Sequence, residues 1–129
     1  MLAALLCGCG SPERATGGLA DSDPYIQALY AMMNLNGCKQ QRRANPRPAD
    51  LAKTEELIAR AAGEFASVEA AAKSRGHADY VQRAHIDFAQ RIEEELHALC
   101  DPDEQAASKR ASDAIARLRA HLASLPQTH

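Results

Sequence analysis

Residues 48–76 read PADLAKTEELIARAAGEFASVEAAAKSRG, and this stretch decides the fold class. The single Gly63 inside it costs about 1 kcal/mol relative to Ala and favours a local bend, and Gly76 is a typical helix end. Apolar or small side chains recur at alternating steps of three and four residues and form one narrow seam. The seam consists of Leu51, Thr54, Ile58, Ala61, Phe65, Val68 and Ala72. The pattern predicts a helix from about Pro48 to Arg75 that packs against other helices.

An amphipathic helix is also predicted before this stretch. Asp23 can cap its start, and Pro24 then stands at the first helical position, where its missing N–H costs no hydrogen bond. Its apolar stripe at helical spacing consists of Ile26, Leu29, Tyr30 and Met33. The sequence allows two positions for the C-terminal end of this helix. It stops at Asn36-Gly37, or it continues to Asn45-Pro46.

Two further helices are predicted after it. The link Gly76-His77-Ala78 is short, so a third helix over about 79–99 should lie antiparallel to the second. Asp101-Pro102 repeats the Asp-Pro start, and a fourth helix then runs to Pro126. The expected buried residues are Val81, Ala84, Phe88, Ile92, Leu96 and Leu99 in the third helix and Ile115, Leu118, Leu122 and Leu125 in the fourth.

Composition agrees with helices and excludes some functions. The 129-residue chain has no Trp and only 4% aromatic residues, which is typical of closely packed helices rather than a β-sandwich or barrel. Its net charge of −2 excludes a generally basic nucleic-acid binder, and no apolar run reaches the length of a spanning helix. We therefore expect an all-α domain, an antiparallel up-down-up-down four-helix bundle.

The first residues, MLAALLCGC, form an apolar stretch that ends at Gly10-Ser11-Pro12. Leu6-Cys7-Gly8-Cys9 resembles the bacterial lipoprotein signal, in which an aliphatic and a small residue precede an obligatory cysteine. The resemblance implies cleavage after Gly8, lipidation of Cys9 and a periplasm-facing, lipid-anchored protein of the cell envelope. Residues 1–8 are then a signal-peptide remnant, 9–22 a flexible tether and 23–129 the bundle domain. The alternative is an ordinary cytosolic N-terminus.

Two of the four cysteines, Cys38 and Cys100, remain after Cys7 is removed and Cys9 is lipidated. In an up-down-up-down bundle the first and third helices point the same way, so their C-terminal ends lie at the same end of the bundle. We therefore predict a disulfide between Cys38 and Cys100, because the expected compartment permits oxidation. The alternative, if the chain stays in the cytosol, is two buried thiols.

The charges are unevenly distributed along the chain. A basic stretch contains Lys39, Arg42, Arg43 and Arg47, and an acidic stretch runs from Glu93 to Glu104. The basic stretch could bind phosphate, peptidoglycan or lipid headgroups. We favour the other interpretation, in which both stretches lie at the same end of the bundle and compensate one another.

Candidate metal and haem ligands are sparse. Glu94 and His97 form one Glu-x-x-His motif, whereas di-iron bundles need two, and His97 is predicted to face solvent. Met32 or Met33 could pair with His121 on a haem, but they are predicted at opposite ends of the bundle. The two methionines are better explained as core and rim residues. We therefore expect no metal and no cofactor.

No catalytic constellation is found either. The chain has no G-x-S-x-G, H-E-x-x-H or phosphate-binding glycine loop. His85 is predicted to be the only partly buried histidine, as a hydrogen-bonded boundary residue. An exposed apolar surface for a partner helix is suggested by Tyr80, Ile86, Ala89, Ala59, Ala62, Ala66 and Ala70.

These observations favour a small non-catalytic lipoprotein whose bundle binds a protein partner. Small size, a lipid tether and one disulfide resemble periplasmic immunity or inhibitor proteins, and an accessory protein of an envelope machine fits equally well. The alternative is a small-ligand or metal-binding periplasmic bundle. An enzyme ranks last, because paired catalytic groups are missing from the sequence.

Overall fold

The computed structural model describes residues 18–44, 48–92 and 104–127. They form four α-helices: α3 (Pro24–Ala44), α4 (Pro48–Ser74), α5 (Ala78–Ile92) and α6 (Glu104–Ser124). No strand is found in these ranges. The all-α class is therefore confirmed, and so are the predicted starts of α3 and α4.

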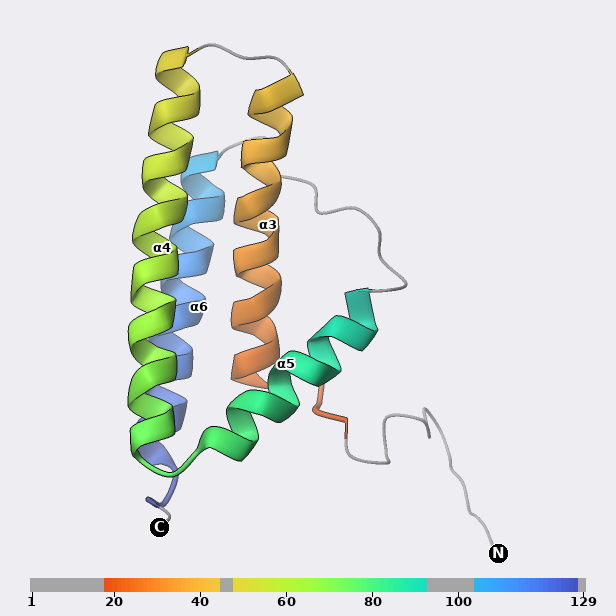
Figure 1. The fold of residues 1–129 in the computed structure, drawn as a ribbon, viewed down its shortest axis with the longest axis vertical. Coiled ribbons are helices and arrows are strands. Elements are labelled where there is room, and N and C mark those ends of the chain that lie inside the picture. Colours follow the sequence, from red (N-terminus) through yellow and green to blue (C-terminus); the bar gives the residue numbers. More distant parts are fainter. Residues whose placement is uncertain (1–17, 45–47, 93–103, 128–129) are drawn as a thin grey trace, which may run out of the picture.

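Three of the helices form the main body of the bundle. α3, α4 and α6 lie side by side; α4 runs antiparallel to α3, and α6 runs in the same direction as α4 (Figure 1). α5 crosses this group obliquely and packs against α3 and α4 rather than forming a fourth column (Figure 1). The structure is thus a helical bundle, but it does not confirm the regular up-down-up-down arrangement.

The core lies between α3, α4 and α6. Tyr25, Leu35, Ile115 and Leu118 are fully buried there. The predicted α4 seam faces this core, with Thr54, Ala61, Val68 and Ala72 buried and Leu51, Ile58 and Phe65 half-buried. A stripe at helical spacing was sufficient to identify it, because such residues share one face of the helix.

α3 begins at its predicted cap and extends to the later of its two predicted end points. The Asp23 carboxylate accepts hydrogen bonds from the backbone N–H of Tyr25 at 2.8 Å and of Ile26 at 3.4 Å. The helix continues through Gly37, which is buried, to Ala44. Leu35 and Cys38, on either side of that glycine, are also buried, so packing outweighs the intrinsic cost of glycine in a helix.

The turn between α4 and α5 follows a Schellman pattern. Gly76 has a φ of 92°, a conformation that glycine adopts without steric cost. The N–H of His77 donates to the carbonyl of Ala72 at 2.9 Å, and the carbonyl of His77 accepts the N–H of Val81. The same residue therefore closes α4 and opens α5, which sets the direction in which α5 leaves.

Candidate functional site

Four aromatic rings meet where α3, α4 and α5 come together. The Tyr25 ring packs edge-on against Phe65 at 5.8 Å, Tyr80 at 5.5 Å and His85 at 5.7 Å between centroids. The ring of His121, in α6, packs edge-on against Tyr80 with 5.9 Å between centroids. Edge-to-face pairs of this kind add to ordinary burial. Tyr25 is therefore the centre of the junction between the three helices.

Two carboxylates, those of Glu69 and Asp23, form hydrogen bonds with the polar atoms of these rings. The Tyr25 hydroxyl donates to Oε2 of Glu69, and Nε2 of His85 contacts the same oxygen. The Tyr80 hydroxyl donates to Oδ1 of Asp23 at 2.8 Å. Burial, reinforced by these carboxylates, raises the pKa of both Tyr25 and Tyr80 above the usual value for tyrosine. Such hydroxyls stay neutral and donate hydrogen bonds, so these contacts attach α5 to α4 and to the start of α3.

The predicted hydrogen bond of His85 is confirmed by its contact with Glu69, but the prediction that it is the only partly buried histidine is wrong. His85 is exposed, whereas His121 is half-buried and His77 is only 7% exposed. The buried Nε2 of His77 has no hydrogen-bond partner. The Schellman turn places His77 inside the α4–α5 corner, and helical periodicity could not show this for a residue between helices. His77 lines an open cavity of about 360 Å³ together with Gly76, Asp79, Tyr80 and Arg83.

The sequence patterns also did not predict a buried ion pair on α5. Arg91 is 5% exposed and Asp87 7%, and Nε of Arg91 donates to Oδ2 of Asp87 at 3.0 Å. Burial lowers the pKa of Arg91, but Asp21 and Asp87 outweigh it and raise that pKa overall. Both residues occupy the α5 face that was predicted to hold only Val81, Ala84 and larger apolar residues.

The partners of this ion pair lie in the segment before α3, residues 18–23, which we call the N-terminal strap. Arg91 donates to the carbonyl of Leu19 and to the carboxylate of Asp21, and the N–H of Leu19 donates to Asp87 at 3.2 Å. Leu19 is half-buried and packs against the core. The strap, which includes the last residues of the predicted tether, is therefore attached to α5.

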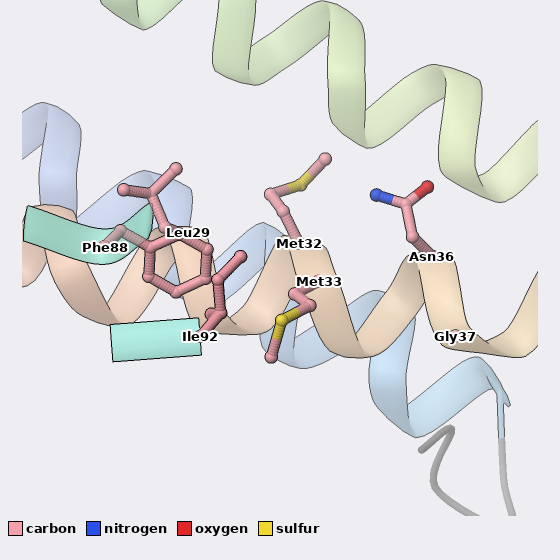
Figure 2. Close-up of a pocket in the computed structure, with 7 residues that line it drawn as sticks. All are labelled: Leu29, Met32, Met33, Asn36, Gly37, Phe88 and Ile92. Atoms are coloured by element: carbon pink, nitrogen blue, oxygen red, sulfur yellow. The ribbon is translucent and has the colours of Figure 1, made fainter. Parts of the chain in front are cut away.

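An apolar groove lies between α3 and α5. Its volume is about 380 Å³, and Figure 2 shows the side chains that line it. Met32, Met33 and Leu29 come from α3, with Asn36 and Gly37 further along that helix, and Phe88 and Ile92 come from α5. Met32 is buried and Met33 half-buried, in agreement with the predicted core and rim roles. Among the described residues, the oblique course of α5 (Figure 1) leaves this face of α3 partly uncovered.

The other predicted sites are described only in part. Cys38 is buried, and Cys9 and Cys100 lie outside the described residues. The acidic stretch before Glu104, the side chains of the basic stretch and the Glu94–His97 motif also lie outside them. The pairing of Cys38 with Cys100 therefore stays a prediction.

The expected exposed apolar surface is found with one exception. Ile86 is 52% exposed, and the four alanines on the outer face of α4 are exposed as predicted. Tyr80 is half-buried instead, because its ring packs against Tyr25. Among residues 18–44, 48–92 and 104–127, no three potential metal ligands lie together, and no helix has the length and apolar character needed to cross a membrane.

No protein-family model, no curated protein and no solved structure matches the chain significantly.

Proposed function

We propose that this chain is a non-catalytic lipoprotein of the bacterial cell envelope, facing the periplasm, whose bundle binds a protein partner. The resemblance of Leu6-Cys7-Gly8-Cys9 to a lipoprotein signal supports the membrane anchor. The groove between α3 and α5 carries the binding proposal. An immunity or inhibitor protein and an accessory protein of an envelope machine both fit this description.

The groove has the chemistry of a site for an amphipathic partner helix. Its walls are aliphatic and aromatic, and the two methionines, Met32 and Met33, can adapt to the shape of an inserted side chain. Asn36 supplies a polar group at one end, where a partner's backbone or polar side chain can be oriented. Helix-in-groove recognition uses an apolar floor of this kind.

A charged substitution in the groove tests the binding proposal. Met33→Lys places a cation in the apolar wall, whereas Ala66→Lys adds the same charge to the exposed outer face of α4 as a matched control. Affinity capture from envelope extracts should return one stoichiometric partner with the wild type and with Ala66→Lys, and Met33→Lys should lose it. Retention by both variants, or capture of no partner by the wild type, would contradict the proposal.

The anchor is tested separately. Cys9→Ser should release the protein from the membrane fraction, because the acylated sulfur is lost. Cys7→Ser is the matched control, since that cysteine belongs to the segment removed with the signal. Unchanged fractionation of Cys9→Ser would show that Cys9 is not the lipid attachment site.

A small apolar ligand is the second candidate, favoured by the volume of the groove. About 380 Å³ falls within the range of roughly 300–1,000 Å³ that small-molecule sites occupy. Native mass spectrometry of wild-type protein would then show a bound molecule that Met33→Lys loses. If metal were bound instead, alanine substitution of His85, His97 and His121 should remove it, whereas partner capture should be unaffected.

A further inference from the structure

The geometry points to α5 as the membrane-facing element of this protein. The N-terminal strap holds the outer face of α5, around Ile86, against the surface of a phospholipid bilayer. This inference rests on the proposed lipid anchor at Cys9, and it adds which side of the bundle meets the membrane.

The strap sets the point at which the chain leaves the folded domain. Arg91 and Asp87 bind both the N–H and the carbonyl of Leu19, and Arg91 also binds Asp21. Two charges that are each more than nine-tenths buried make this a defined attachment rather than a surface contact. The chain toward Cys9 therefore starts beside α5, next to the beginning of α3 (Figure 1).

The length of the link restricts which surface can reach the membrane. The chain from Cys9 to Gly18 spans at most about 30 Å when fully extended. As the predicted flexible tether it would average about 17 Å. The 21 residues of α3 extend for about 30 Å, so the far end of the bundle near Ala44 lies beyond that average reach. The surface beside the strap is the one held close to the bilayer.

The outer face of α5 suits contact with lipid headgroups. Its exposed residues after Arg83 are His85, Ile86, Ala89 and Gln90, which include no carboxylate and no Lys or Arg. Ile86 is the exposed large hydrophobic residue of the described chain, at 52% exposure. Nearer the start of α5, Asp79 and Arg83 balance each other in charge. Within the described part of α5, an aliphatic side chain on a face with few charges can enter the membrane interface.

Tryptophan fluorescence can test this orientation, because the chain contains no Trp. Ile86→Trp places a single reporter on the outer face of α5, and Ala62→Trp places a matched reporter on the exposed outer face of α4. Each lipidated protein is reconstituted into vesicles of phosphatidylethanolamine and phosphatidylglycerol with brominated acyl chains. Trp at position 86 should lose most of its fluorescence relative to unbrominated vesicles, and Trp at position 62 should keep its intensity.

A second variant tests the strap itself. Asp87→Leu with Arg91→Met replaces the ion pair by apolar side chains and releases Leu19 and Asp21. Quenching at position 86 should then fall toward that at position 62, while helical content by circular dichroism stays unchanged. Undiminished quenching would show that the strap does not orient the protein.

The outcomes separate this inference from the proposed function. Equal quenching at positions 86 and 62 in vesicle-bound protein overturns the orientation and leaves the anchor intact. Failure of the wild-type protein to associate with vesicles, matching the behaviour of Cys9→Ser, contradicts the anchor on which the inference rests.

Discussion

Helices α5 and α6 both pack against α3, but they bury different kinds of side chain. The buried residues of α6 are all apolar: Ala107, Ala111, Ala114, Ile115, Leu118 and Leu122. Those of α5 are Val81, Ala84, Asp87 and Arg91. The hydrophobic effect holds most of α6 in place, and one hydrogen bond, from the hydroxyl of Thr54 to the carboxylate of Glu104, joins its first residue to α4. α5 depends on polar contacts at three points along its length: Tyr80 with Asp23, His85 with Glu69, and Arg91 with the strap.

This difference means that α5 can be loosened while the α3–α4–α6 core stays folded. Among the buried residues of α5 only Val81 and Ala84 are apolar, and regions that bury few apolar side chains open locally at lower free energy than the core. The groove and the strap both use α5, so the proposed partner and membrane contacts belong to the more easily perturbed part of the molecule. The following predictions test that division, from the largest expected effect to the smallest.

Reduction of the predicted disulfide between Cys38 and Cys100 should have the largest effect. The loop that this bond closes should contribute about 4 kcal/mol to the free energy of unfolding. Reduction should raise the intact mass by about 2 Da, the mass of two hydrogens. Hydrogen exchange should then increase more in α5, which leads toward Cys100, than in α6. An unchanged mass, or equal loss of protection in both helices, would contradict this prediction.

Leu118→Ala tests the apolar attachment of α6. Leu118 is fully buried, so the lost burial and the cavity should lower the free energy of unfolding by about 3 kcal/mol. Val81→Ala on α5 removes a smaller buried side chain and should cost less. Urea denaturation measures both. A larger loss for Val81→Ala would show that α5, rather than α6, carries the apolar stability.

Arg91→Ala tests the polar attachment of α5. It leaves the Asp87 carboxylate buried without its cation and should cost about 2 kcal/mol. The double change of Asp87→Leu with Arg91→Met removes both charges and should stay within about 1 kcal/mol of the wild type. Limited proteolysis should cut the strap faster in both variants. Equal destabilisation of the single and double variants would mean that packing, not charge, dominates this contact.

Tyr25→Phe should have the smallest effect at neutral pH, about 1 kcal/mol for one hydrogen bond. The folded state raises the pKa of Tyr25 and Tyr80, so their contribution is complete below the ordinary tyrosine pKa of about 10. It declines above that pH, where only the unfolded chain ionises readily.

Wild-type stability should therefore fall with rising pH above about 10, and Tyr25→Phe should make that fall less steep. Val81→Ala, which lowers stability without removing a titratable group, is the control and should keep the wild-type slope. Denaturation midpoints across alkaline pH measure the effect. A slope that Tyr25→Phe leaves unchanged would contradict the role of the Tyr25–Glu69 hydrogen bond.

Much of the fold could be predicted from the sequence, and the candidate site much less. The Asp23 cap, the end of α4 before Gly76 and the α4 seam depend on residues a few positions apart, so local patterns revealed them. Phe88, Ile92 and Met33 were placed on apolar stripes, but Phe88 and Ile92, which were predicted to be buried, are only half-buried. That they line an open groove could not be predicted, because the sequence does not show how much of each stripe a neighbouring helix covers.

By itself, the sequence determined the helices, their caps and the faces they bury, because hydrogen bonding and side-chain periodicity act over one or two helical turns. The tertiary structure decided the crossing of α5, the burial of Asp87, Arg91 and His77, and the attachment of the strap. Each of these depends on which surfaces meet across many intervening residues. A charged residue on a helix becomes a buried clamp only when a distant segment, here residues 18–23, supplies its partners.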